Sequence, residues 1–185
     1  MRLLRLVALI ALAATLAASG CGTSAPAASR SAPGGVAASP VGADPPPGSS
    51  AQAIVVRVVD GDTIRAKIGR RVERVRFIGM DTPEVVKPNT PVQCFGREAS
   101  ALTKALLPEG SVIHLVADVE ARDRYRRLLA YVYRDLDGAF VNLLLVEEGY
   151  AVPYTYPPNV AHADDFVAAA GRARDERRGL WSRCR

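Results

Sequence analysis

Short stretches of β-branched and other apolar residues recur in the chain after residue 50, and turn signals separate them. Five of these stretches predict strands: residues 54–59, 63–68, 71–78, 112–119 and 128–134. In the third stretch, a period of two places Val75 and Phe77 on one face, while Arg74 and Arg76 fall on the other. The arginine face is therefore available to a ligand.

Three further segments carry apolar residues three and four positions apart, which is the spacing of an amphipathic helix. They are residues 96–107, 141–148 and 162–178. Residues 85–95 contain prolines without periodicity and predict a surface loop. Short strands with helices between and after them predict an α+β fold, a five-stranded OB-fold-like barrel with three α-helices.

The first fifty residues have a different character. A positively charged start is followed by an apolar run that is too short to span a membrane, so residues 1–20 are predicted to be a signal peptide. The run ends in Ala18-Ser19-Gly20-Cys21, which resembles the lipobox of bacterial lipoproteins. The resemblance implies that a lipid is attached to Cys21. Cleavage at an Ala-x-Ala-like site with full secretion is the alternative.

Residues 21–51 are rich in Ala, Pro, Ser and Gly and predict a disordered tether, which leaves residues 52–185 as the folded domain. The formal net charge of +5 permits an anionic partner. Most of the positive charge is arginine, whose planar fork can bind phosphate through two hydrogen bonds. In an exported protein Cys94 and Cys184 favour one disulfide, with two unpaired thiols as the alternative.

Two acidic motifs follow predicted strands. Asp60 and Asp62 are two residues apart, so in an extended chain they would project to the same side and recruit a cation or a proton. Alone, however, Asp-Gly is a common hairpin turn. Asp81-Thr82-Pro83-Glu84 could be a capping box at a helix start. Because Pro88 and Pro91 interrupt the residues that follow, we favour a functional site instead.

Two arginines stand near these motifs in the sequence. Arg76 lies five residues before Asp81 on the polar face of its predicted strand, and Arg127 leads into residues 128–134. Basic residues beside a strand usually lie on the solvated surface. If they converge on the carboxylates, they combine an oxygen-ligand metal site with guanidinium groups that can bind phosphate.

These motifs together resemble the thermonuclease (staphylococcal nuclease-like) family. The resemblance covers residues 53–181 and rests on six segments: residues 59–63, Arg76 ahead of residues 81–84, residues 94–100, 127–131, 154–159 and 179–181. It implies a calcium-dependent endonuclease that hydrolyses DNA and RNA with weak sequence preference, the 5′-oxygen being the leaving group.

The resemblance also implies a role for each acidic residue. Asp62, Asp81 and the backbone carbonyl of Thr82 match the ligands of one Ca²⁺ ion, with Asp60 nearby and acting through water. Glu84 matches the general base that activates the attacking water. These roles suit a reaction without a covalent intermediate.

The implied substrate contacts come from basic and aromatic residues. Arg76 and Arg127 match the pair that binds the scissile phosphate, and Arg127 also assists departure of the leaving oxygen. Arg124 and Tyr125 match residues that contact a neighbouring phosphate. Tyr154 and Tyr156 match aromatic residues beside the base and the sugar. For the last two, packing in the core or at a rim is the alternative.

The sequence also departs from the family pattern. Arg126 and Leu128 replace glycines that usually flank the second arginine, and Arg124 replaces a lysine, which affects rate and substrate fit. The rival interpretation is a lipoprotein that captures nucleic acid or another polyanion without cutting it. We expect a monomer whose membrane contact is the lipid on Cys21.

Overall fold

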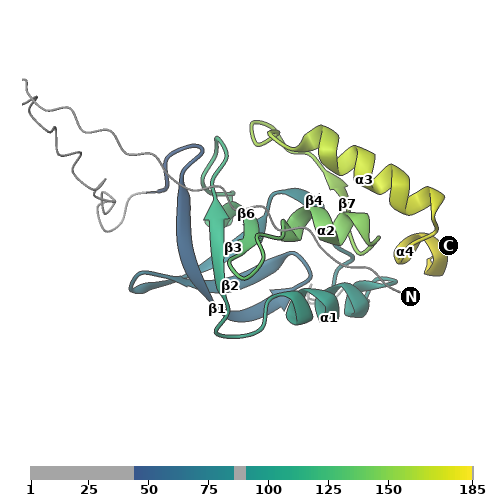
Figure 1. The fold of residues 1–185 in the computed structure, drawn as a ribbon, viewed down its shortest axis with the longest axis horizontal. Helices are drawn as coiled ribbons and strands as arrows, with labels where there is room; N and C mark the ends of the chain where they lie inside the picture. The colour runs from purple at the N-terminus through teal and green to yellow at the C-terminus, as the bar shows by residue number, and fades with distance from the viewer. Residues whose placement is uncertain (1–43, 86–90, 185) are drawn as a thin grey trace, which may run out of the picture. The chain divides into compact units, whose positions relative to one another are not determined.

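A closed five-stranded barrel forms the centre of the structure (Figure 1). This computed structural model describes residues 44–85 and 91–184. Around the barrel the strands are β1 (Ser50–Asp60), β2 (Thr63–Ile68), β3 (Arg71–Phe77), β6 (Leu128–Arg134) and β5 (Val112–Val116). β3 and β6 run parallel, and every other neighbouring pair runs antiparallel. The predicted barrel is therefore confirmed.

The ends of three strands differ from the prediction, and β3 ends at Phe77 rather than at residue 78. β1 begins at Ser50, inside the predicted tether, because Ser50 pairs with Val116 of β5 and Ala51 pairs with Leu115. β5 ends at Val116 rather than at residue 119. The predicted signal peptide, the lipobox with Cys21 and most of the tether lie outside the described residues, as does part of the predicted loop at 85–95.

Three helices accompany the barrel, as predicted. They are α1 (Gly96–Leu106), α2 (Val141–Glu147) and α3 (Ala163–Asp175). α3 ends three residues before the predicted position, because Arg177 has a φ of 52°, which an α-helix does not accommodate. A further single turn, α4 (Leu180–Arg183), follows it. None of the helices in the described part of the chain is long and apolar enough to cross a membrane.

A second sheet, which the sequence did not predict, continues from the end of β3. Its two short strands are β4 (Gly79–Asp81) and β7 (Val152–Tyr154). Phe166 of α3 is fully buried against Gly79, where an added Cβ would lie only 2.1 Å from the Phe166 ring. Gly79 also has a φ of 83°, which favours glycine. This close contact holds α3 against the strand that ends in Asp81.

A buried asparagine joins α2 to the barrel near the same place. The Asn142 side chain donates hydrogen bonds to the carbonyls of Ile78 (2.9 Å) and Ala130 (3.3 Å), and accepts one from the amide of Val132 (2.9 Å). Buried polar groups are costly unless they are paired in this way. Asn142 therefore fixes the end of β3 against β6.

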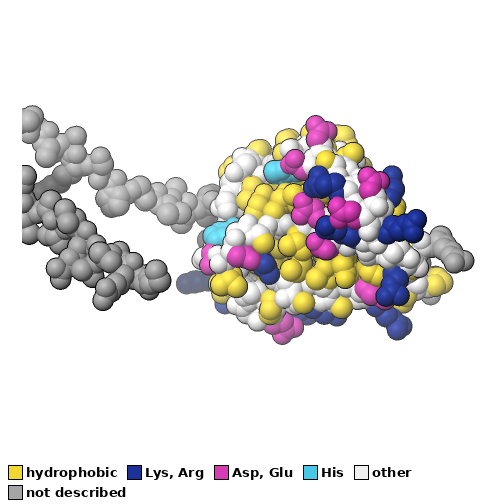
Figure 2. All heavy atoms as spheres, turned by 45° about the vertical axis from the view of Figure 1, so that its right-hand side comes forward, with side chains coloured by type: hydrophobic (Ala, Val, Ile, Leu, Met, Phe, Trp, Pro, Cys, Tyr) yellow, Lys and Arg dark blue, Asp and Glu magenta, His cyan; other side chains and the backbone are white. Residues whose placement is uncertain are grey.

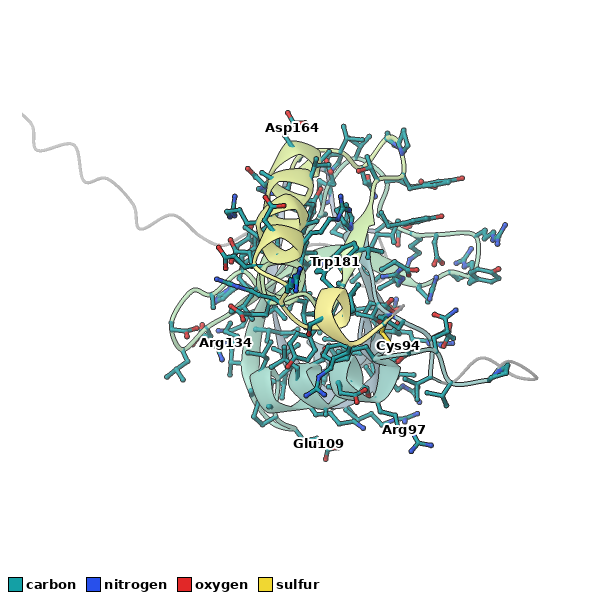
Figure 3. The ribbon with its side chains drawn as sticks, turned by 90° about the vertical axis from the view of Figure 1, so that its right-hand side faces the viewer. Cys94, Arg97, Glu109, Arg134, Asp164 and Trp181 are labelled. Carbon is teal, nitrogen blue, oxygen red and sulfur yellow. A yellow bond between two sulfur atoms is a disulfide. The ribbon has the colours of Figure 1, made fainter. Side chains whose placement is uncertain are left out.

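The predicted disulfide between Cys94 and Cys184 is confirmed, with 5.9 Å between the two Cα atoms. It joins the segment before α1 to the segment after α4, and Figure 3 shows Cys94 beside α4. On α4, the ring of Trp181 lies under the guanidinium of Arg174 at 4.5 Å. The C-terminal turn is therefore held both by a covalent bond and by packing on α3.

Candidate active site

The acidic end of the β1–β2 hairpin lies next to Arg76. The register of β1 against β2 shifts between Val58 and Asp60, so Val59 is an extra residue, and Asp60 pairs with Thr63. Thr63 in turn pairs with Arg76 of β3. A bulge of this kind re-aims the residue that follows it. It brings Asp60, Thr63 and Arg76 side by side across three strands.

Asp60 and Asp62 do not lie on one extended strand, contrary to the prediction. Residues 61 and 62 form the tight turn of the hairpin and are not extended, so alternation along a strand does not apply. The two carboxylates are nevertheless close enough for the charge of Asp62 to act on Asp60. Both residues are buried, at 6% and 8% exposure.

Arg76 connects two of the predicted metal ligands. Its Nη1 lies 3.1 Å from Asp62 Oδ2, and its Nη2 lies 2.5 Å from Asp81 Oδ1. Nη1 also donates to the carbonyls of Phe77 (3.1 Å) and Met80 (3.0 Å). The side chain is only 12% exposed. Because four acceptors surround it, this guanidinium is fixed in orientation before any ligand binds.

Thr82 is held by Asp62 through both its backbone and its side chain. The Thr82 amide and hydroxyl each donate to Asp62 Oδ2 at 3.2 Å. Gly61 makes the approach possible, since a Cβ there would lie 2.6 Å from Thr82 Oγ1. No helix begins at Asp81, because residues 82–85 are not helical, so the capping-box alternative is wrong.

The carboxyl groups of the site raise one another's pKa. The pKa of Asp60 rises to about 7, chiefly through burial, then through a hydrogen bond with Glu84 and the charges of Asp62 and Glu84. Burial also raises the pKa of Asp81, an effect that Arg76 opposes and Asp62 reinforces. Burial is thus the main cause of both shifts, and the neighbouring carboxyl groups add to it.

Glu84 is positioned by Gln93. The Glu84 amide donates to Gln93 Oε1 at 2.8 Å, and the Gln93 amide donates to the Glu84 carbonyl at 3.0 Å. Gln93 immediately precedes Cys94 of the disulfide. Glu84 thus belongs to a segment that the disulfide anchors.

A cleft of about 810 Å³ lies beside this cluster. It brings together seven of the residues that the sequence singled out: Arg76, Asp81, Arg124, Tyr125, Arg127, Tyr154 and Tyr156. Asp60, Asp62 and Glu84 do not line it, and Thr82 lines a neighbouring hollow of about 300 Å³ together with Asp81. Asp81 therefore stands where the acidic cluster meets the cleft.

Arg127 reaches the cleft but does not pair with the acidic cluster. Its Nε donates to Asp123 Oδ2 at 2.6 Å, and its amide donates to Asp123 Oδ1 at 2.9 Å. The Tyr125 amide donates to the same oxygen at 2.9 Å. Sequence reasoning missed Asp123, although an aspartate that bonds the amide two residues on is a known turn signal.

Residues 74–183, more than half of the chain, match the family described as staphylococcal nuclease homologue. The chain belongs to this family.

Three relatives illustrate how far the likeness extends. The chain is 44% identical to the thermonuclease of Staphylococcus intermedius over 130 residues, which are 70% of this chain and 76% of that protein. It is 42% identical to the thermonuclease of Staphylococcus hyicus over 69% of this chain and 74% of that protein. To the SPbeta prophage-derived endonuclease YokF of Bacillus subtilis (strain 168) it is 41% identical over 69% of this chain, but it spans only 43% of that relative.

Two departures of this staphylococcal nuclease homologue from the family pattern have structural consequences. Arg126, which stands where a glycine is usual, has a φ of 64°. Such a left-handed conformation costs a non-glycine residue about 1–2 kcal/mol. Leu128, at the second such position, is 4% exposed and pairs with Val75 inside the barrel. The two replacements therefore act on backbone strain and on the core, respectively.

The aromatic residues of the cleft are exposed. Tyr125, Tyr154 and Tyr156 are 63%, 53% and 65% exposed, so packing in the core is excluded as the role of the last two. The guanidinium groups of Arg124 and Arg127 lie 4.8 and 5.4 Å from the centre of the Tyr125 ring. One wall of the cleft thus combines cationic and aromatic surface.

Proposed function

We propose that this chain is a calcium-dependent endonuclease that hydrolyses DNA and RNA with weak sequence preference and with the 5′-oxygen as leaving group. The observation that carries the proposal is Arg76, which bonds Asp62 and Asp81 at the edge of a cleft that also contains Arg127. Membership in the family, and relatives named thermonuclease and endonuclease, support it.

The acidic cluster suits a hard cation. Among the described residues, no three His, Cys, Asp or Glu side chains are grouped so that they could hold a metal ion by themselves. The proposed set instead joins two carboxylates, Asp62 and Asp81, to the Thr82 carbonyl, and oxygen donors of this kind are those that Ca²⁺ prefers. Asp81 also lies within reach of the negative charges of Asp62 and Glu84, which a cation would offset. When bound, Ca²⁺ would neutralise phosphate charge and make a bound water more acidic.

Glu84 would accept the proton of the attacking water. The pKa of Asp60, about 7, means that Asp60 carries a proton for much of the time near neutrality. It can then donate the hydrogen bond that it shares with Glu84, which orients the Glu84 carboxyl group. Gln93 holds the backbone of Glu84 while this happens.

The two arginines would share the phosphate. Arg76 would exchange part of its contact with Asp62 and Asp81 for phosphate oxygens. Arg127 Nε already donates a hydrogen bond to Asp123. The two terminal nitrogens of Arg127 form no hydrogen bond to any residue that the structure describes. Fixed donors of this kind stabilise the charge that develops on the phosphorus-bound oxygens, and Arg127 would also assist the leaving oxygen. The exposed tyrosines would stack on bases without reading their identity.

The test is an incubation of the purified protein with single-stranded DNA and with RNA, first with Ca²⁺ and then with excess chelator. Glu84→Gln, which keeps the shape of the side chain, is run beside it. Cleavage that requires Ca²⁺ and falls by about two orders of magnitude or more in the variant supports the proposal. Tight binding without cleavage would refute it and leave the capture lipoprotein.

The proposed location is outside the cytoplasm, with a lipid on Cys21 as the anchor. The lipobox-like sequence and the disulfide support it, since disulfides persist in oxidising compartments. Mass spectrometry of the mature N-terminus decides between the two alternatives. A diacylated Cys21 is expected, whereas an unmodified N-terminus would show simple secretion.

A further inference from the structure

A row of three arginines crosses the outside of the barrel next to the candidate active site. Arg57 of β1 pairs with Arg65 of β2, and Arg65 pairs with Arg74 of β3. All three are exposed. Residues directly opposite each other on neighbouring strands stand about 4.5–5.5 Å apart at Cβ, so these form one continuous arginine row.

The backbone of β1 is adjusted so that Arg57 joins this row. Val55 pairs with Ala66 and Arg57 pairs with Arg65, so Val56 is an extra residue, a bulge. Without it, Arg57 would point into the barrel, because Val55 is buried and alternation would bury position 57 as well. The bulge therefore turns a third guanidinium to the outer surface.

The side chains of the arginine row have no acidic partner in the part of the chain that the structure describes. Like charges placed opposite each other destabilise a sheet. The side chains of the row form no hydrogen bond and no ion pair with a residue in 44–85 or 91–184. The exposed residues of β1, β2 and β3 include further cations, Lys67 and Arg71, and no acidic residue. The row thus costs stability without an evident internal compensation.

Some arginines elsewhere on the surface pair with acidic residues. Figure 2 shows a face on which acidic and basic side chains intermingle. In α3 and just after it, Arg172 pairs with Glu147, while Arg178 pairs with Glu148 and Glu176. The arginine row differs from these arginines because the structure gives it no acidic partner among the described residues.

The position of the row connects it to the cleft. Arg74 lies two residues before Arg76 on the same face of β3, about 7 Å along the strand. We propose that the arginine row is a second binding surface for the phosphate backbone of a nucleic acid whose scissile phosphate lies at Arg76. The identity of the ligand rests on the proposed function. The backbone would leave the cleft past Arg74 and cross the barrel along Arg65 and Arg57.

The test is the salt dependence of binding, measured by fluorescence anisotropy with the full-length chain. The row variant carries Arg57→Gln, Arg65→Gln and Arg74→Gln. The control variant removes the same amount of charge from exposed helical positions, through Lys104→Gln, Arg172→Gln and Arg183→Gln. Every protein also carries Glu84→Gln so that the DNA stays intact. The probes are a dinucleotide and a single strand of about 20 nucleotides, longer than the roughly 4–16 nucleotides that one OB-type barrel covers.

For the long strand, the slope of log affinity against log salt should be shallower by about 2 in the row variant than in the control variant, as three lost phosphate contacts require. Dinucleotide binding should be equal in the two, and a variant with lysine at the three row positions should keep the slope. Equal slopes for row and control variants would overturn the proposal. The proposal would also be overturned if the row variant lost binding to vesicles of anionic lipid but not to the long strand, since the surface would then face a membrane.

This outcome is separable from the proposed function. Hydrolysis is assayed separately with Glu84 intact, and an absence of hydrolysis would refute the proposed nuclease activity. The salt slopes would still show whether the arginine row binds nucleic acid. The melting temperature of the row variant is recorded as well. It should stay the same or rise, because the substitutions remove repulsion.

Discussion

Removal of the disulfide is expected to cost a large part of the stability of the domain. The bond joins residues 90 positions apart, and closing a loop of that length is worth about 4–5 kcal/mol in the chain-entropy account. Domains of ordinary size have a free energy of unfolding of about 5–15 kcal/mol. The double variant Cys94→Ser, Cys184→Ser should therefore remain folded at low temperature but unfold at a much lower guanidinium chloride concentration.

The same substitution should loosen the segment that carries Glu84. Gln93, which bonds both backbone groups of Glu84, precedes Cys94, and Cys184 ends the turn that begins at Gly179. Hydrogen exchange at the Glu84 and Gln93 amides should consequently accelerate more than exchange in the barrel strands.

The assay is equilibrium unfolding followed by the fluorescence of Trp181, the one tryptophan of the chain. The oxidised wild type is compared with the double variant and with the wild type after reduction, which separates the loss of the bond from the change to serine. Reduced wild type and double variant should coincide. A loss of free energy below about 1 kcal/mol in both would refute the reasoning from loop closure.

Three further changes have defined expected outcomes. Asp123→Asn removes the charged acceptor of Arg127 Nε, so single-turnover cleavage should fall about tenfold, while Asp123→Glu recovers part of the rate; equal rates would exclude positioning by Asp123. Arg126→Gly should stabilise the protein by about 0.5–1 kcal/mol because it relieves the positive φ, whereas Arg126→Ala should not; a thermal melt compares them. Gly79→Ala should destabilise by about 3 kcal/mol through its clash with Phe166, and an unchanged melting temperature would contradict that packing.

The barrel strands could be predicted because their signals are local. The Asp-Gly and Gly-Arg turns fix the register of β1, β2 and β3, and alternation assigns the faces of Val75 and Arg76. β4 and β7 could not be found in this way. Each has three residues, and they pair across more than seventy positions of sequence, with Gly79 and Pro153 among them. Neither residue type favours a strand.

The candidate site shows the same division. Asp62, Asp81 and Arg76 were singled out by type and order, and the structure brings them into contact. The bulges in β1 were not foreseeable, because an extra residue leaves no mark in a run of valines. They decide where Asp60 and Arg57 lie. The assignment of roles within the site stays a prediction.

The central claim is that the Arg76 cluster and the adjoining cleft hydrolyse phosphodiester bonds. The most direct measurement is the single-turnover cleavage rate of a single-stranded DNA with Ca²⁺, for the wild type and for Arg76→Lys, which keeps the charge but loses the fork that bonds Asp62 and Asp81. A melt of the same samples confirms that both are folded. We predict a rate lower by about 10²–10³ in the variant, the usual effect of losing one donor to the developing charge. Equal rates, or no cleavage by the wild type, would contradict the account.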